Sequence, residues 1–214
     1  MRYHEYLQCA RKHLDSCVEL FNSYNANQAN RQNELSVFLE LYYLLGYVIE
    51  GFTIYSVYKI NNWPSSVDIK NWDRDRHNNN RFVKNQIQDF IRNTGLDFYK
   101  DRKTIDPNTN SYTSTSVFPQ GIVRYFVESH KYQYIVCNLL SPSPAFNNFP
   151  YFGNGQLDTN IRNLIHDWDP KIRYYYPARL LQSNLTLKNN LTESNISLLI
   201  DTCKDIIINR AHQI

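Results

Sequence analysis

Apolar residues recur near the start of the chain with the period of a helix. Intervals of three or four residues separate Tyr3, Leu7, Ala10, Leu14, Cys17 and Phe21. Polar residues, including Arg11, Lys12, Asp15 and Glu19, fall between them. This spacing places the apolar side chains on one stripe and the charged ones opposite. The pattern therefore predicts an amphipathic helix over residues 2–24.

The second apolar segment, residues 34–60, has no polar face. Only Glu40 and Glu50 interrupt its central part, leaving uncharged runs at 41–49 and 51–58. A membrane span needs about 20 consecutive apolar residues, whereas a helix that is apolar all round is typical of a bundle centre. We therefore predict a buried central helix, with Gly46 at a close helix–helix contact. The short polar connection, residues 25–33, predicts an antiparallel hairpin of the first two helices.

The rest of the chain predicts further helices and no run of strands. Trp63-Pro64 is expected to end the second helix, and Thr94-Gly95 a short one. Asp158 is expected to cap a helix that runs to about His166, and Thr192 to open the last helix. The expected apolar positions of the short and last helices are Phe82, Ile87, Phe90 and Ile91, then Ile196, Leu199, Ile200, Cys203, Ile206 and Ile207. A helix over 121–140, a loop over 101–116 and an irregular crossing over 145–156 complete the prediction.

We thus predict an all-α fold with a single domain over residues 1–214, in which residues 61–117 form an irregular insertion. The chain has 214 residues and a net charge of +3. Residues 69–104 carry nine Lys or Arg against five Asp or Glu. Within that stretch, basic and aromatic residues alternate at Trp72, Arg74, Arg76, His77, Arg81 and Phe82. This mixture suits single-stranded RNA, but Asp73 and Asp75 dilute its charge, and a solvated loop is the simpler interpretation.

The cysteines Cys9, Cys17, Cys137 and Cys203 have neither metal-pair nor redox-pair spacing. Buried free thiols in a reducing compartment are therefore expected. Charged residues near the N-terminus, including Arg2 and Glu5, replace the apolar core of a secretion signal. We accordingly expect a cytoplasmic location, no membrane association, no metal and no cofactor.

Three features together resemble the HEPN family, small α-helical domains of bacterial defence and toxin–antitoxin systems. They are the paired first helices, the segment Tyr43-Leu-Leu-Gly-Tyr-Val-Ile-Glu50, and Arg173-Tyr174 with Pro177 before the terminal helix. The resemblance covers roughly residues 2–60 and 120–212 and implies a HEPN-like helical bundle that forms a homodimer. Glu50 is then either a polar anchor in a ligand groove or a buried carboxylate paired with a tyrosine hydroxyl or an arginine.

Many HEPN proteins are metal-independent ribonucleases that use an Arg and a His separated by a short spacer. Arg stabilises the charge that builds on the phosphate, and His moves a proton. Arg162-Asn-Leu-Ile-His166 has three intervening residues and shares a helix face. The segment from Arg124 to His130 has five, on different faces. The resemblance therefore suggests Arg162 and His166 as catalytic residues and Arg173, Tyr174, Arg124 and His130 as substrate-binding residues.

The resemblance implies two functions. The first is RNA or nucleotide binding in a defence, stress or toxin–antitoxin setting, with metal-independent endoribonuclease activity as its enzymatic form. The second is a catalytically silent scaffold that binds a protein partner or antitoxin through an exposed helical face. A small-molecule-binding protein that uses the crossing at 145–156 is a third alternative.

Overall fold

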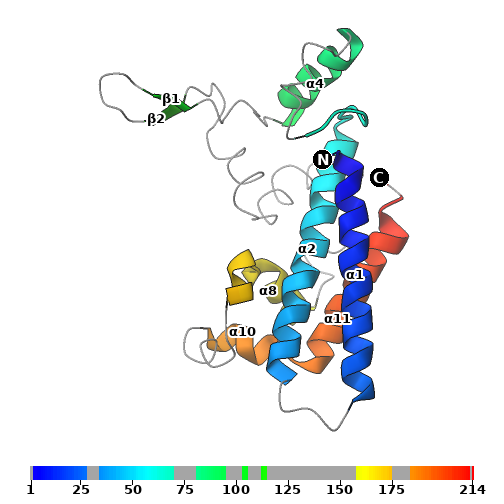
Figure 1. Ribbon diagram of the computed structural model, residues 1–214, viewed down its shortest axis with the longest axis vertical. Coiled ribbons are helices and arrows are strands. Elements are labelled where there is room, and N and C mark those ends of the chain that lie inside the picture. The colour runs from blue at the N-terminus through cyan, green and yellow to red at the C-terminus, as the bar shows by residue number, and fades with distance from the viewer. Residues whose placement is uncertain are drawn as a thin grey trace.

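The computed structural model describes residues 2–27, 34–69, 81–94, 103–105, 112–114, 158–174, 184–212 and 214. This part of the chain is mostly helical, as predicted (Figure 1). Its helices are α1 (Tyr3–Ala26), α2 (Glu34–Ile60), α4 (Arg81–Thr94), α8 (Thr159–Asp167), the 3-10 helix η4 (Pro170–Tyr174), α10 (Leu185–Asn190), α11 (Glu193–Lys204) and the π-helix η5 (Asp205–Arg210).

One short hairpin departs from the expectation of no strands. Strand β1 (Lys103–Ile105) pairs antiparallel with β2 (Tyr112–Ser114), with Thr104 opposite Thr113. Both strands contain β-branched or aromatic residues, which favour extended backbone. Each strand is only three residues long, too short for an alternating pattern to be recognised in the sequence.

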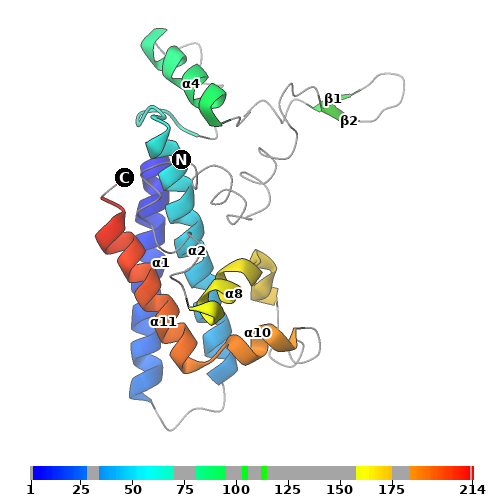
Figure 2. The same cartoon turned by 180° about the vertical axis from the view of Figure 1, so that it is seen from behind.

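Helices α1 and α2 lie side by side and run in opposite directions (Figures 1 and 2). The Tyr3 ring lies 5.9 Å from the Tyr55 ring near one end, and the Cys17 thiol lies 4.0 Å from the Leu41 carbonyl towards the other. The predicted stripe of α1 faces this contact, with Leu7, Ala10, Leu14 and Cys17 buried and Tyr3 and Phe21 partly buried. The prediction of the amphipathic helix is therefore confirmed.

Gly51, rather than Gly46, lies at the close contact between these two helices. A Cβ atom at Gly51 would lie 2.9 Å from the Tyr6 carbonyl oxygen and 3.2 Å from the Ala10 Cβ. Gly46 instead faces the indole of Trp168, which belongs to the segment between α8 and η4. The prediction for Gly46 was right about close packing and wrong about the partner, because sequence alone does not show which element covers a given face.

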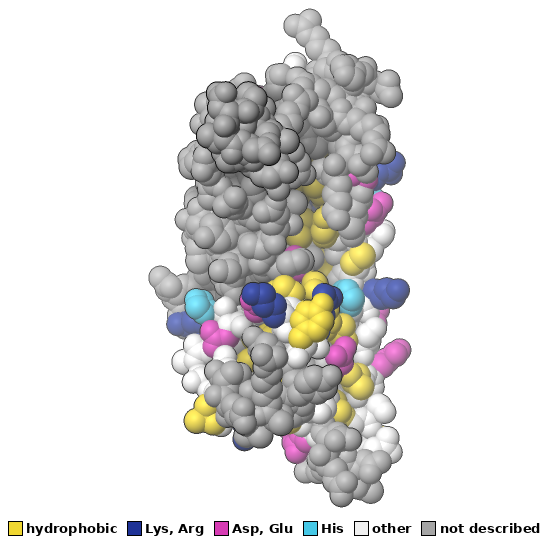
Figure 3. Space-filling view, turned by 60° about the vertical axis from the view of Figure 1, so that its left-hand side comes forward, with side chains coloured by type: hydrophobic (Ala, Val, Ile, Leu, Met, Phe, Trp, Pro, Cys, Tyr) yellow, Lys and Arg dark blue, Asp and Glu magenta, His cyan; other side chains and the backbone are white. Residues whose placement is uncertain are grey.

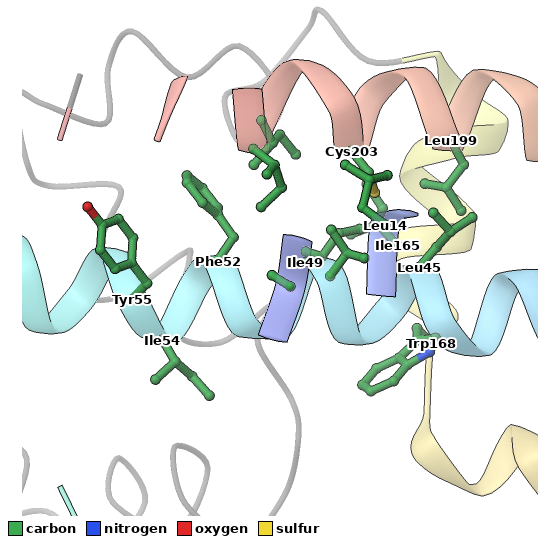
Figure 4. Packing of buried hydrophobic residues seen from close by; sticks show 14 of the residues in the cluster. Leu14, Leu45, Ile49, Phe52, Ile54, Tyr55, Ile165, Trp168, Leu199 and Cys203 are labelled. Carbon is green, nitrogen blue, oxygen red and sulfur yellow. The ribbon is translucent and has the colours of Figure 1, made fainter. Parts of the chain in front are cut away.

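Helix α2 is buried on several sides at once. Leu45, Ile49 and Phe52 face Leu14 of α1 and the residues Leu199 and Cys203 of α11, whereas Trp168 lies on another side of α2 (Figure 4). By length and composition α2 is apolar enough to cross a membrane, yet 67% of the 18-residue apolar stretch that meets this criterion is buried inside the protein. The elements α1, α11 and η4 pack against α2 and cover its apolar side chains.

Polar groups inside α2 have partners within the helix. Thr53 and Ser56 are fully buried, and their hydroxyls donate to the Ile49 and Phe52 carbonyls at 2.7 and 2.8 Å. These bonds satisfy two hydroxyls that would otherwise be costly to bury. They allow α2 to remain a central helix despite its polar residues.

Helix α2 ends at Ile60, close to the predicted stop. Asn62 adopts a left-handed conformation (φ 57°), and the Trp63 amide donates to the Tyr58 carbonyl at 2.9 Å, an arrangement typical of a helix C-terminus. The Trp63 ring then packs with Tyr58 and with Phe90 of α4. Buried Ile87 and Phe90 confirm two predicted positions of α4, whereas Phe82 is 69% exposed.

The C-terminal helices begin where the sequence predicts. The Asp158 carboxylate accepts from the Asn160 amide at 2.8 Å at the start of α8, and the Thr192 hydroxyl accepts from the Asn195 amide at 3.3 Å at the start of α11. The six apolar positions predicted for the last helix, Ile196, Leu199, Ile200, Cys203, Ile206 and Ile207, are all buried. The last two residues of that pattern, Ile206 and Ile207, lie in η5.

Candidate functional site

The predicted catalytic pair, Arg162 and His166, lies on the exposed side of α8. Ile161, Leu164 and Ile165 form the buried side of this helix. The His166 side chain is 77% exposed, and its Nδ1 atom lies 3.2 Å from the Asp167 carboxylate. The structure thus places the two residues one helical turn apart, as the spacing predicts, on a surface open to solvent.

The predicted binding residues Arg173 and Tyr174 are the last two residues of η4, which begins two residues after Trp168. Asp169 begins this helix, because its carboxylate accepts from the Lys171 amide at 2.8 Å and its carbonyl from the Ile172 amide at 2.9 Å. Ile172 is 2% exposed and anchors η4 in the core, whereas Arg173 and Tyr174 are exposed.

Trp168 determines where η4 meets α2. Its indole is 4% exposed, and its Nε1 donates to the Tyr43 carbonyl at 3.3 Å. The indole lies directly over Gly46, where a Cβ atom would come within 3.0 Å of Nε1, Cε2 and Cδ1. The Tyr47 ring packs edge-to-face against it, with centroids 5.1 Å apart. Gly46 therefore leaves the space that brings η4 next to Tyr43 and Tyr47.

The resulting group of side chains, which we call the tyrosine–arginine cluster, consists of Tyr43, Tyr47, Trp168, Arg173 and Tyr174. The Arg173 guanidinium donates to the Tyr174 hydroxyl and lies 4.5 Å from the Tyr174 ring centroid. The Tyr43 hydroxyl donates to that of Tyr47 at 3.4 Å, and it lies near enough to Arg173 to raise the pKa of the guanidinium. The cation thus lies beside two tyrosine hydroxyls, of which Tyr174 accepts from it directly.

Electrostatics keep the cluster in a defined protonation state. The Tyr43 and Tyr174 hydroxyls raise the pKa of Arg173. Burial, the hydrogen bond with Tyr43 and the charge of Glu50 raise the pKa of Tyr47, while Arg173 opposes them. Arg173 is therefore a permanent cation at neutral pH, and the Tyr47 hydroxyl, which accepts from Tyr43, keeps its own proton.

His13 of α1 borders the cluster, a position that sequence reasoning did not single out. Its ring lies 5.9 Å from the Tyr47 ring, tilted by 32°. Burial, and then the charge of Lys12, lower the pKa of His13, so that the imidazole is neutral at pH 7. The sequence gives no indication that His13 belongs to a binding site, because a single histidine beside an apolar stripe is common in helices without any functional role.

Glu50 is half-buried on α2, one turn after Tyr47. Burial first, and then the charges of Glu50 and Asp68, raise the pKa of Tyr6 to about 12. The carboxylate thus lies within electrostatic reach of two tyrosine hydroxyls, Tyr6 and Tyr47. Both expectations for Glu50, a polar anchor in a ligand groove and a buried carboxylate paired with a tyrosine hydroxyl or an arginine, stay predictions.

One face of the molecule combines charge with apolar area. Figure 3 shows a band of Lys, Arg and His side chains next to hydrophobic ones, with acidic side chains among them. In η4, Tyr174 is 60% exposed. An exposed aromatic ring next to a guanidinium is the combination that binds both parts of a nucleotide, its base and its phosphate.

Several predicted residues lie outside the described residues. These are Arg124 and His130, the basic and aromatic positions Trp72, Arg74, Arg76 and His77, the crossing at 145–156, and Cys137. Cys17 and Cys203 are buried free thiols and Cys9 is an exposed one. Burial raises the pKa of Cys17 to about 12. Within the described ranges, no group of three His, Cys, Asp or Glu side chains is placed to hold a metal ion.

Comparisons with protein-family models, with curated proteins and with solved structures gave no significant match.

Proposed function

We propose that this protein binds RNA or a nucleotide through the tyrosine–arginine cluster, with Arg173 as the phosphate ligand. One observation carries the proposal: an exposed guanidinium that the Tyr174 hydroxyl holds in place beside an exposed aromatic ring. Arginine favours phosphate because its planar fork donates two parallel hydrogen bonds. The bond to Tyr174 orients the fork before a ligand arrives, which lowers the entropic cost of binding.

The finer fold proposal is a HEPN-like bundle in a cytoplasmic protein of a defence, stress or toxin–antitoxin system. The antiparallel arrangement of α1 and α2, and the terminal helix packed against both, support it. So does the placement of Arg173-Tyr174 beside the segment Tyr43–Glu50, because the two parts of the sequence that carried the resemblance meet at one site.

If the protein is also a metal-independent endoribonuclease, Arg162 and His166 are its proposed catalytic residues. In that case Arg162 binds the scissile phosphate and His166 moves a proton. The exposure of His166 and its contact with Asp167 favour binding at the cluster over cleavage on α8. Binding is therefore the function that the geometry supports best.

The test separates binding from cleavage. A mixed RNA pool in EDTA is incubated with wild-type protein and with Arg173→Gln, Lys171→Gln and His166→Ala. We expect RNA binding, measured by anisotropy, to be lost in Arg173→Gln and retained in Lys171→Gln, which removes an exposed charge from the same short helix. Binding that is equal in both variants would contradict the proposal. Cleavage that His166→Ala abolishes would add the enzymatic activity.

A second candidate function is a catalytically silent scaffold that serves as a protein-interaction module. Leu198 on α11 and Ile208 on η5 are 43% and 64% exposed, and exposed aliphatic side chains favour a protein contact. A second copy of the chain, or a protein partner such as an antitoxin, would cover them. Light scattering tests the homodimer: a mass of twice 25.5 kDa that Ile208→Lys halves would support it, and a monomeric wild type would contradict it.

A further inference from the structure

The cluster offers one strong position for a phosphate. Arg173 has five N–H donors, and the Tyr174 hydroxyl accepts from it, so the fork retains donors for a phosphate oxygen. Tyr43 lies close to the guanidinium and donates to the Tyr47 hydroxyl. Because burial and the hydrogen bond with Tyr43 raise the pKa of Tyr47, this side chain adds no second charge to the site.

The same site offers one position for a base. The Arg173 guanidinium lies 4.5 Å from the Tyr174 ring centroid, yet Tyr174 is 60% exposed. Stacking of a base on an exposed aromatic side chain contributes about 1–3 kcal/mol. Because Arg173 and Tyr174 are adjacent in η4, the phosphate and the base that they bind belong to one nucleotide.

The charges around the site limit the length of the ligand. Asp167 and Asp169 precede Lys171 and Arg173, so the stretch 167–174 has no net charge. The charges that reach the Tyr47 hydroxyl are those of Glu50 and Arg173, which have opposite signs. A nucleic acid strand needs a row of cations along its backbone. The tyrosine–arginine cluster itself contributes one cation, Arg173, and the charge of the neighbouring Lys171 is offset by Asp167 and Asp169 in the same stretch.

We propose that the ligand of the tyrosine–arginine cluster is a single nucleoside monophosphate unit, whose base stacks on Tyr174 and whose phosphate binds Arg173. This inference rests on the proposed function and narrows its ligand from RNA or nucleotide to one nucleotide. A purine is preferred to a pyrimidine, because its larger ring system covers more of the tyrosine.

Calorimetric titration of the full chain tests the inference with four probes: AMP, adenosine, inorganic phosphate and oligoadenylate. We expect AMP to bind, and oligoadenylate to bind within about tenfold of it, a difference of about 1.4 kcal/mol. Arg173→Gln is expected to weaken AMP binding by about tenfold or more, the contribution of a charged hydrogen bond. Tyr174→Leu is expected to weaken AMP and adenosine binding more than it weakens inorganic phosphate binding, because it removes the ring as well as the hydroxyl that accepts from Arg173.

Lys171→Gln is the matched control and should bind AMP as the wild type does. Oligoadenylate binding that is more than about a hundredfold tighter than AMP binding, with a steep salt dependence, would overturn the inference and leave the proposed function standing. Absence of binding by all four probes to the folded wild type would overturn both. Circular dichroism of each variant establishes that it is folded.

Discussion

Gly46→Ala tests how Trp168 holds the candidate site against α2. The new methyl group would come within 3.0 Å of three indole atoms, a separation that real side chains do not adopt. The indole must therefore move away from α2. Because Trp168 is 4% exposed and its Nε1 donates to the Tyr43 carbonyl at 3.3 Å, a displacement exposes apolar surface and removes this bond.

The magnitude follows from these contacts. Loss of the hydrogen bond costs about 1 kcal/mol, and loss of the edge-to-face contact with Tyr47 costs about 1 kcal/mol. Re-exposure of half the indole, roughly 100 Å² at about 25 cal/mol per Å², costs a further ~2.5 kcal/mol. Alanine in place of glycine within a helix returns about 1 kcal/mol. We therefore expect the free energy of unfolding to fall by about 3–4 kcal/mol.

Urea denaturation of a double-mutant cycle measures this effect. In a Trp168→Ala background the indole is absent, so Gly46→Ala should be neutral or stabilising there by up to about 1 kcal/mol. The difference between the two backgrounds isolates the steric conflict. An equal cost of Gly46→Ala in both backgrounds would refute the reasoning, because the conflict would then not involve Trp168. A wild-type stability for the single variant would refute it as well.

Three further predictions concern the helices that frame the site. Gly51→Ala should lower the free energy of unfolding by about 1–3 kcal/mol, because its Cβ would lie 2.9 Å from the Tyr6 carbonyl oxygen; thermal denaturation measures this, and an unchanged midpoint would contradict it. Thr192→Ala removes the bond to the Asn195 amide and should cost about 1 kcal/mol in urea denaturation, while Thr192→Ser should restore it. The pKa of His13 is lower in the folded protein than the 6.5 of an unperturbed histidine. Between these two pKa values the unfolded chain binds more protons than the folded one. The free energy of unfolding should therefore fall as the pH drops through this window and be flat above it. His13→Gln should reduce this slope; an identical pH dependence in the variant would argue against it.

The helices were predictable where packing follows a regular period. The stripe of α1 and the apolar positions of α11 and η5 repeat at helical intervals, and the caps at Asp158 and Thr192 use side chains with a known role at helix starts. The two three-residue strands and the exposure of Phe82 were not predictable, because short extended pairs and the face of a short helix depend on tertiary contacts.

The candidate site was predictable in part. The Arg173-Tyr174 pair stood out in the sequence, and the structure brings it to Tyr43 and Tyr47. No periodic pattern connects residues that lie about 130 positions apart, such as Tyr43 and Arg173. The link is Trp168, whose fit over Gly46 depends on three-dimensional shape. His13 was not predictable either, because its contact with Tyr47 depends on how α1 packs beside α2.

The central claim is that Arg173 binds the phosphate of a nucleotide. NMR spectra of the arginine Nε–Hε groups during titration with AMP test it directly, with the Arg173 resonance assigned from its absence in Arg173→Lys. We predict that this resonance shifts progressively and saturates, and that adenosine without phosphate shifts it less. An Arg173 resonance that stays in place at saturating AMP, or shifts confined to other arginines, would contradict the claim.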